Sequence, residues 1–320
     1  GKRDLRCMGP NPSLCCQPRK EKGPALQQVP ATSTTAQIRR ITAPNPSPLT
    51  GAGTNTYILG RGRVAIIDTG PEDDSHFAAI LAALSPLEEI SHILITHPHL
   101  DHSALAPRLA QHTGAPTFGF GTATDGRSSV MEALASTGFP SGGEGLDLGF
   151  TPSRRLRDGE TVIGEEWSVQ AVHTPGHLGS HLCFACEDVL FSGDHVMGWS
   201  TTVVSPPDGD MGAYMASLER MQWQHWTRLL PGHGDAIHDP QQRVQDLIHH
   251  RKGRETDILR ALVAGAQDST ALTRQIYTGL DAKLLPAARR NVLAHLIDLH
   301  DKGQVRSLGP LGPEAVFQLC

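Results

Sequence analysis

The sequence predicts an α+β protein, in which a mixed core of strands and helices is followed by a smaller helical domain with a β ribbon. Three observations support this prediction. Short apolar, β-branched runs such as residues 93–96 are typical of buried strands, and segments with helical spacing such as residues 73–84 lie between them. From residue 240 onward, successive helix candidates precede two short strand candidates. At 320 residues the chain is long enough for a large core and a second domain.

The first half of the chain alternates strand and helix signals. Residues 1–37 lack periodicity and contain repeated prolines, so we predict a flexible extension rather than a helical targeting segment. The elements predicted next are a hairpin of strands 54–59 and 64–68, helix 73–84, strand 93–96, helix 105–112 and strand 116–120. Residues 121–149, rich in Gly, Ser and Thr, include a helix candidate at 129–136 and are interpreted mostly as a variable surface loop.

The pattern changes from residue 240 onward, and we predict two domains after residue 37: a core of residues 38–250 and a winged-helix-like domain of residues 251–320. Core strands are expected at 167–173 and 188–191 and before Pro231, with a helix at 214–221. The later elements predicted are helices 243–250, 255–264, 269–277 and 286–302, with short strands at 305–306 and 315–318. Helices followed by a small ribbon are typical of a winged helix.

Composition excludes few functions. The formal net charge of −5 does not indicate a strongly basic nucleic-acid binder. No apolar run approaches the ~20 residues that cross a bilayer, and the N-terminus lacks a secretory-type apolar segment, so we expect no membrane partner and a cytoplasmic location. The cysteines form no recurring metal pattern, and Cys183 and Cys186 are expected to be buried free thiols.

The most informative stretch is the loop after the strand at 93–96, where four metal-capable side chains lie close together: His97, His99, Asp101 and His102. Pro98 stiffens this loop, and imidazole with carboxylate suits a pair of neighbouring cations. A His-rich surface turn is the alternative. Three further strand ends also carry potential ligands, namely His177, Asp194 and His233, and strand ends in open sheets gather ligands at one site.

The order of these motifs resembles the metallo-β-lactamase superfamily, in its glyoxalase-II-like branch. Its His-x-His-x-Asp-His loop stands here as His97, His99, Asp101 and His102, and the later His, Asp and His loops follow. The tail resembles the winged helix of lactamase-beta-like type 2 proteins, through His250-Arg251, Arg254-Glu255 and the final helix with Asn291, His295 and Leu296. The resemblance covers nearly the whole chain after residue 40 and implies a four-layer αβ/βα sandwich.

The resemblance also implies two divalent cations, with zinc preferred and iron or manganese also suited to such ligands. It assigns His97, His99 and His177 to the first cation and Asp101, His102 and His233 to the second, with Asp194 between both. Asp101 is the expected catalytic residue, accepting a hydrogen bond from a metal-bridging hydroxide that attacks the substrate. Asp68 is expected to support the metal loop from behind, although its spacing alone favours a turn former.

Several residues close to the predicted ligands could be mistaken for metal ligands or other site residues. His173 is expected to be a strand residue, and His181 is not taken as a ligand. His195 either supports the metal site or is an ordinary loop residue. Packing is the better interpretation of Tyr214.

Three functions are compatible with this pattern of motifs, two of them metal-dependent hydrolyses. The first is endoribonuclease activity on single-stranded RNA, weakly favoured by a modest excess of basic residues in the tail, without a visible aromatic stacking platform. The second is hydrolysis of a thioester or ester, glyoxalase-II-like or acyl-carrier-thioesterase-like, with the tail as a wall of the acyl pocket. The third is a nucleic-acid or protein docking module with a degenerate core, which the complete ligand set disfavours.

Overall fold

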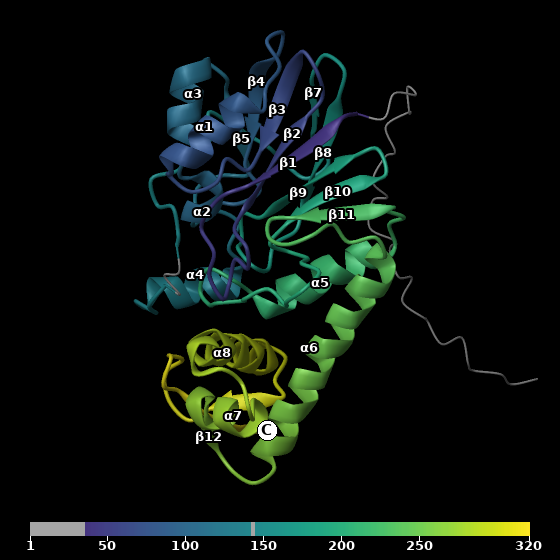
Figure 1. Cartoon of the computed structure of the whole chain (residues 1–320). Coiled ribbons are helices and arrows are strands. Elements are labelled where there is room, and N and C mark those ends of the chain that lie inside the picture. The colour runs from purple at the N-terminus through teal and green to yellow at the C-terminus, as the bar shows by residue number, and fades with distance from the viewer. Residues whose placement is uncertain (1–35, 142–144) are drawn as a thin grey trace, which may run out of the picture.

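The computed structural model describes residues 36–141 and 145–320. The predicted extension at 1–37 lies almost entirely outside this part of the chain. Two sheets form the core (Figure 1). The first contains β1 (Ile38–Thr42), β2 (Asn55–Leu59), β3 (Arg63–Ile67), β4 (Glu89–Leu94), β5 (Thr117–Gly119) and β6 (Arg154–Arg155), in that order. The second, in the order β11-β10-β9-β8-β7, contains β7 (Thr161–Ile163), β8 (Ser168–His173), β9 (Leu182–Cys186), β10 (Val189–Gly193) and β11 (Arg228–Pro231).

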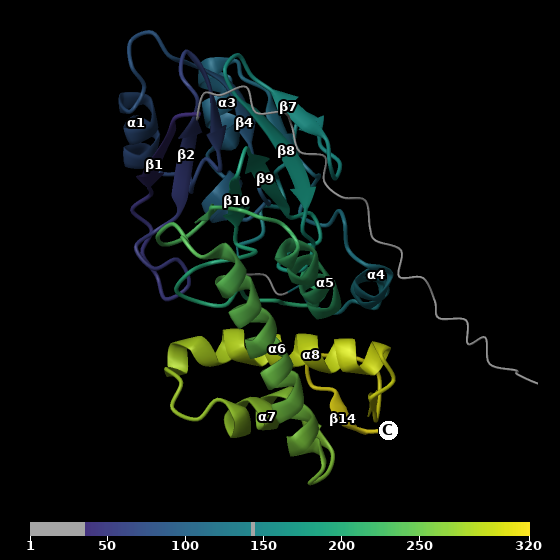
Figure 2. The ribbon, with the colours of Figure 1, turned by 90° about the vertical axis from the view of Figure 1, so that its right-hand side faces the viewer.

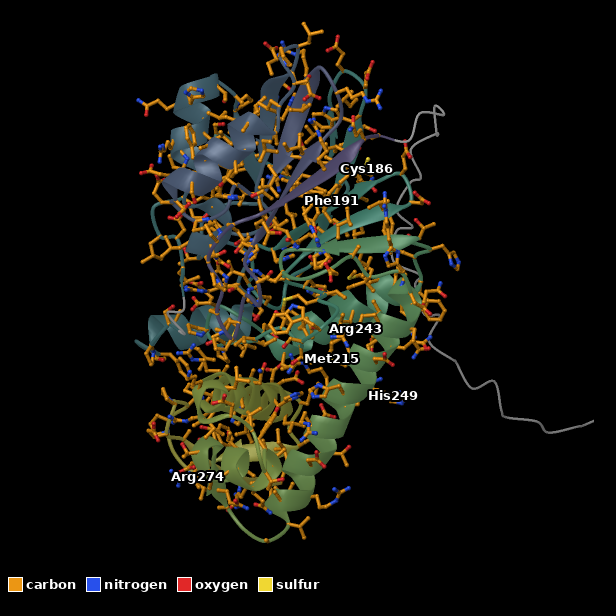
Figure 3. All side chains as sticks on the ribbon, viewed as in Figure 1. Cys186, Phe191, Met215, Arg243, His249 and Arg274 are labelled. Atoms are coloured by element: carbon orange, nitrogen blue, oxygen red, sulfur yellow. The ribbon has the colours of Figure 1, made fainter. Side chains whose placement is uncertain are left out.

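Alternating side chains of each sheet build separate hydrophobic layers, as the pleat of a strand requires. Leu59 and Ile67 point toward the second sheet and pack in one cluster with Phe184 and Phe191, and Figure 3 labels Phe191 together with Cys186 from the same cluster. On the opposite face of the first sheet, Ile58 and its neighbours pack against helices. The predicted hairpin is confirmed, since Tyr57 pairs with Ile67 in an antiparallel register.

Helices cover both outer faces of the two sheets. The helices of the core are α1 (Asp74–Ala82), α2 (Leu100–Ser103), α3 (Ala106–Thr113), α4 (Ser129–Ser136) and α5 (Met211–Gln222). Ile80 of α1 and Leu109 of α3 pack on the first sheet, whereas Leu218 of α5 and Leu247 of the long helix α6 (Pro240–Leu262) pack on the second. The predicted four-layer αβ/βα sandwich is therefore confirmed. Asp73 caps α1 as expected, because its side chain accepts a hydrogen bond from the amide of His76.

The C-terminal part is a winged helix, as predicted. It comprises α6 (Pro240–Leu262), α7 (Ser269–Ile276), the 3₁₀ turn η1 (Ala282–Leu284), α8 (Leu285–Asp301), β12 (Gln267–Asp268), β13 (Val305–Ser307) and β14 (Val316–Leu319). The prediction of two separate helices at 243–250 and 255–264 is wrong, because α6 is continuous over 23 residues. The predicted domain boundary at 250/251 lies inside this helix, which runs from the core to the C-terminal part (Figure 2).

The helix predicted at 129–136 within the expected surface loop of residues 121–149 is confirmed, but this helix is not a surface feature. α4 begins and ends where the sequence predicts, but Met131, Leu134 and Phe139 are buried in one cluster with Ile258 of α6 and Leu293 of α8. The insertion thus packs the core domain against the winged helix. Within the described ranges 36–141 and 145–320, no helix is long and apolar enough to cross a membrane.

Candidate metal centre

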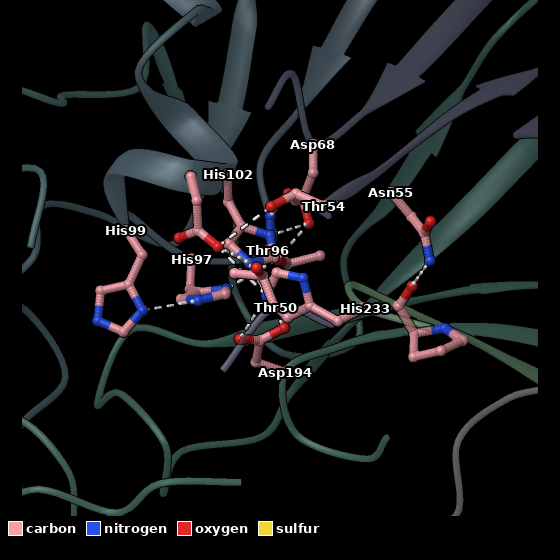
Figure 4. Close-up of polar contacts among 12 residues, drawn as sticks. Thr50, Thr54, Asn55, Asp68, Thr96, His97, His99, His102, Asp194 and His233 are labelled. Atoms are coloured by element: carbon pink, nitrogen blue, oxygen red, sulfur yellow. Dashed lines mark hydrogen bonds and ion pairs between the residues drawn. The ribbon is translucent and has the colours of Figure 1, made fainter. Parts of the chain in front are cut away.

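Four loops at strand ends converge on one cluster of side chains. β4 ends at Leu94 and leads into the His97 loop, and β8, β10 and β11 end just before His177, Asp194 and His233. Figure 4 shows how side chains from three of these loops approach one another, namely those of His97, His99, His102, Asp194 and His233. The structure brings together all seven residues that the sequence nominates: His97, His99, Asp101, His102, His177, Asp194 and His233. Their role as metal ligands stays a prediction.

The cluster separates into two groups with one shared carboxylate. In the first, Nδ1 of His99 lies 3.0 Å from Nε2 of His97 and 3.2 Å from Nε2 of His177. In the second, Oδ2 of Asp101 lies 3.5 Å from Nε2 of His102 and 3.2 Å from Nε2 of His233. These groups match the division between two cations that the resemblance implies.

Asp194 lies between the two groups. Its Oδ1 is 3.4 Å from Nε2 of His102, whereas its Oδ2 is 3.3 Å from Nε2 of His233 and 3.8 Å from Nε2 of His177. This approach requires a glycine at position 232, because a Cβ there would lie 2.4 Å from Oδ1 of Asp194. The carboxylate can therefore contact cations on both sides.

The donor set fits divalent cations. The outward ring nitrogens of four histidines are already used. Nδ1 of His177 lies 2.7 Å from the carbonyl of Val203, and Nδ1 of His233 lies 3.2 Å from that of Gly53. Nδ1 of His97 contacts the Thr96 hydroxyl and Nδ1 of His102 contacts Asp68. A proton on the outward nitrogen leaves the inward nitrogen with a free lone pair, which is the form that binds zinc, iron or manganese.

The pKa values of the histidines are shifted in opposite directions in the two groups. Burial lowers the pKa of His97 well below its usual range and that of His99 to about 3, so both are neutral at pH 7. Burial also opposes protonation of His102 and His233, but the carboxylates of Asp101 and Asp194 outweigh it. They raise the pKa of His102 well above its usual range and that of His233 to about 9. Although burial acts in the opposite direction, these histidines hold the pKa values of Asp101 and Asp194 low.

Asp68 supports the metal loop, as the resemblance implies. Its Oδ2 lies 2.9 Å from Nδ1 of His102, and its two oxygens accept hydrogen bonds of 2.8 Å from the amide and the hydroxyl of Thr96. The carboxylate thereby fixes both ends of the strand-to-loop transition. The interpretation of Asp68 as only a turn former is wrong.

The other histidines have separate positions. His173 lies in β8 and stacks on Phe120, as expected for a strand residue. His181 is not among the clustered side chains, but its Nε2 accepts a 3.2 Å hydrogen bond from the amide of Asp194. This supporting role of His181 could not be predicted from the sequence, because the spacing from Thr174 to His181 does not reveal it. His195 is fully buried beside Tyr214, which packs in the core as expected.

A cavity of about 690 Å³ opens onto the cluster. His99, Asp101, His177, Asp194 and His233 lie at its base. Residues remote in sequence form its sides, including Leu49, Leu100, Leu146, Trp199, Tyr277, Leu284, Ala287 and Ala288. The winged helix thus contributes one wall. These lining residues were not predicted, because single apolar residues in separate segments carry no local signal in the sequence.

Comparison with known proteins identifies the family. The family model of the metallo-beta-lactamase superfamily matches residues 49–233. The chain belongs to this superfamily. A model of the beta-lactamase-associated winged helix domain matches residues 269–310 of this superfamily member. The Beta-lactamase-like protein 2 homolog of Drosophila melanogaster is 35% identical over 291 residues, which cover 87% of this chain and 93% of that protein.

Solved metallo-beta-lactamase structures share the whole architecture. A metallo-beta-lactamase family protein from Thermus thermophilus matches 88% of this chain and 98% of its own, with a TM-score of 0.70 and 24% identity. A beta-lactamase domain protein from Burkholderia ambifaria matches 95% and 96%, with a TM-score of 0.72 and 21% identity. At these identities the likeness establishes the fold, including the appended winged helix.

Proposed function

We propose that this protein is a metal-dependent hydrolase of a carboxylic ester or thioester with an apolar acyl group. Members of the metallo-beta-lactamase superfamily are usually metal-dependent hydrolases. The observation that carries the choice of substrate is the position of α8 and the preceding turn, whose Leu284, Ala287 and Ala288 line the cavity above the metal centre. A cavity of about 690 Å³ is of the size that encloses a small organic molecule.

The residues at the base of the cavity have distinct roles in this proposal. Two divalent cations in such a site lower the pKa of a bound water and polarise the bond to be cleaved. His97, His99 and His177 would hold one cation, and Asp101, His102 and His233 the other. Asp101 is partly exposed to the cavity, and the Thr54 hydroxyl donates a 3.2 Å hydrogen bond to its Oδ2. Asp101 could thus accept a hydrogen bond from the water and orient it.

The upper part of the cavity suits an acyl chain. Its sides carry Leu49, Leu100, Leu146, Leu284 and Ala287 in addition to Trp199. Burial of apolar surface there gives roughly 25 cal/mol per Å², so each methylene of a bound acyl chain contributes about 0.8 kcal/mol. The ester carbonyl would face the metal ligands while the chain lies against α8.

Single-stranded RNA is the second candidate, favoured by Trp199. This indole lines the cavity and is 47% exposed, so a base could stack on it. The charge of the winged helix nevertheless favours an acyl substrate over RNA, because many of its basic side chains already form salt bridges with carboxylates. Arg254 and Arg260 contact Asp257, Arg289 contacts Glu314, and Lys302 contacts Asp298. A docking role for α8 is disfavoured, since this helix already lines the cavity.

A parallel hydrolysis assay tests the proposal. Zinc-loaded protein and its His97→Ala variant would be given acyl thioesters and esters of increasing chain length and a single-stranded RNA. We expect thioester or ester turnover that depends on chain length and is lost in the variant or after chelation. RNA cleavage without acyl turnover would overturn the first proposal in favour of the second. Activity that survives both the variant and the chelator would overturn the metal-dependent mechanism.

A further inference from the structure

The segment of residues 202–204 holds one of the predicted metal ligands. Nδ1 of His177 lies 2.7 Å from the carbonyl of Val203 and 3.1 Å from the hydroxyl of Thr202. These contacts fix the rotation of the imidazole ring and direct Nε2 toward His99. The orientation of His177 therefore depends on the position of the 202–204 segment, although this segment lies far from His177 in sequence.

Two residues from the helices of the winged-helix region hold the 202–204 segment. Arg251 of α6 donates a 2.5 Å hydrogen bond from Nη2 to the carbonyl of Thr202. Asn291 of α8 accepts a 3.0 Å hydrogen bond from the amide of Val204 at its Oδ1. The same Oδ1 accepts a 3.2 Å hydrogen bond from Nη1 of Arg251, so the two side chains also hold each other.

Arg251 is an unusual residue to bury. It is only 1% exposed, and within residues 36–141 and 145–320 no carboxylate lies within ion-pair distance of its guanidinium. Its charge faces neutral oxygens and the ring of Tyr214, whose centroid lies 5.3 Å from Cζ. Burial of an arginine without an acidic partner is costly, and apolar packing would fill this position more cheaply. Its hydrogen bonds to the carbonyl of Thr202 and to Oδ1 of Asn291 explain why an arginine is present.

From these contacts we infer that Arg251 and Asn291 are positioning residues for His177. They transmit the packing of the winged-helix region to one half of the metal centre through the 202–204 segment. No comparable contact from Arg251 or Asn291 reaches the second group, Asp101 and His233, within the described residues. The inference rests on the proposed metal centre, and it assigns the C-terminal domain a role in metal binding as well as in forming the cavity.

Two substitutions and their matched controls separate positioning from packing. Arg251→Met keeps an extended side chain but removes the donors. Asn291→Leu keeps the volume but removes the acceptor, whereas Asn291→Asp retains an acceptor beside Arg251. Arg243→Met is the control on the same helix: Arg243, labelled in Figure 3, donates to the carbonyls of Met197 and Ser200 in the preceding part of the loop and does not contact residues 202–204.

The measurement is zinc affinity of the full chain, by competition with a chromogenic chelator, with circular dichroism as the test of folding. We expect two zinc ions per chain in the unaltered protein. In Arg251→Met and Asn291→Leu one of the two should bind more weakly, by up to the roughly 10- to 100-fold loss that follows when the group directly behind a metal ligand is removed. Asn291→Asp and Arg243→Met should keep both affinities near those of the unaltered protein.

The outcomes distinguish this inference from the proposed function. Zinc binding by the unaltered protein with unchanged affinities in folded Arg251→Met and Asn291→Leu would overturn the positioning role alone. The positioning role would also be overturned if Arg243→Met weakened zinc binding as much as Arg251→Met, or if Asn291→Asp weakened it as much as Asn291→Leu. Packing would then account for the loss. A failure of the unaltered protein to bind zinc, iron or manganese would overturn both the inference and the proposed function.

Discussion

Asp68 lies directly behind His102, with 2.9 Å between its Oδ2 and the outward ring nitrogen Nδ1. The φ angle of Asp68 is +53°, in the left-handed region that Asp and Asn tolerate better than other residues with a Cβ. The carboxylate also receives the amide and hydroxyl of Thr96. One side chain thus sets both the bend after β3 and the direction in which His102 points.

Asp68→Asn should weaken one cation site while the fold is retained. Asn accepts the left-handed backbone but lacks the negative charge that orients and strengthens His102 as a ligand. We expect about 10- to 100-fold lower zinc affinity at the group of Asp101, His102 and His233. Chelator competition measures it, with Asp73→Asn at the distant cap of α1 as the control. Unchanged zinc affinity in the folded variant would contradict the role of Asp68.

Asp194→Asn should weaken both cations together. The carboxylate of Asp194 faces both groups, because its Oδ2 lies near His177 of the first group and His233 of the second, and its Oδ1 lies near His102 of the second. A neutral amide offers one oxygen and a nitrogen that binds cations poorly, so the asparagine side chain cannot bind both cations. Elemental analysis after dialysis would measure the metal content. Two tightly held cations per chain would exclude the shared position of Asp194.

Zinc binding should release protons near neutral pH. In the cation-free protein the carboxylates of Asp194 and Asp101 overcome burial and raise the pKa of His233 to about 9. Its ring must lose about one proton when Nε2 binds a cation at pH 7. Zinc affinity should therefore rise with pH until about 9. Calorimetry in buffers of different ionisation enthalpy counts the protons, and affinity independent of pH from 7 to 9 would refute this prediction.

The same pKa shift sets a stability trend for the cation-free protein. Because the folded pKa of His233 lies above the ordinary value of 6.5, protonation of its ring stabilises the folded state. This contribution is fully present below pH 6.5 and is lost as the pH rises through about 9.

Leu134→Ala should destabilise the whole molecule. Leu134 of α4 is 4% exposed and packs in the cluster that includes α6 and α8. Removal of a buried leucine side chain costs about 2–5 kcal/mol of unfolding free energy. Urea unfolding measures this loss against Ser136→Ala, an exposed position on the same helix. A loss as small as that of the control would mean that α4 is not part of this core.

Ala287→Leu should shorten the acyl chain that the enzyme accepts. Ala287 lines the cavity from α8, so a larger side chain occupies space that a long acyl group needs. We expect kcat/KM for the longest acyl thioesters to fall by about tenfold or more while short ones are unaffected. Ala282→Leu, exposed in the neighbouring 3₁₀ turn, is the control. A uniform change over all chain lengths would place the acyl group elsewhere.

Strand-end motifs made the cluster predictable from sequence. A short apolar strand followed by Pro and His places ligands at a sheet edge, and an apolar strand followed by Pro-Gly-His recurs before His177 and His233. Local signals also gave the bounds of α4 and the hairpin of β2 and β3. Each of these features is encoded within a few consecutive residues, through strand propensity, turn chemistry or capping.

Features that depend on tertiary contacts were not predictable in the same way. Gly253 lies within the His-Arg-Lys-Gly-Arg segment and weakens the helical signal, yet packing of Val244 on the core and Ile258 on the winged helix keeps α6 continuous. The cavity side chains Leu49, Trp199 and Leu284 come from three segments that meet only in the folded chain. Local sequence does not encode such a meeting.

The continuity of α6 limits how this protein can diversify. One helix supplies Leu247 to the core beneath the second sheet and Leu262 to the core of the winged helix, without a linker between them. A recombination event at residue 250 would join two halves of a helix that pack against different neighbours. Because an α-helix rises about 1.5 Å and turns about 100° per residue, even a one-residue insertion would rotate one half away from its neighbour. The winged helix therefore has to change together with the core rather than be exchanged as a module.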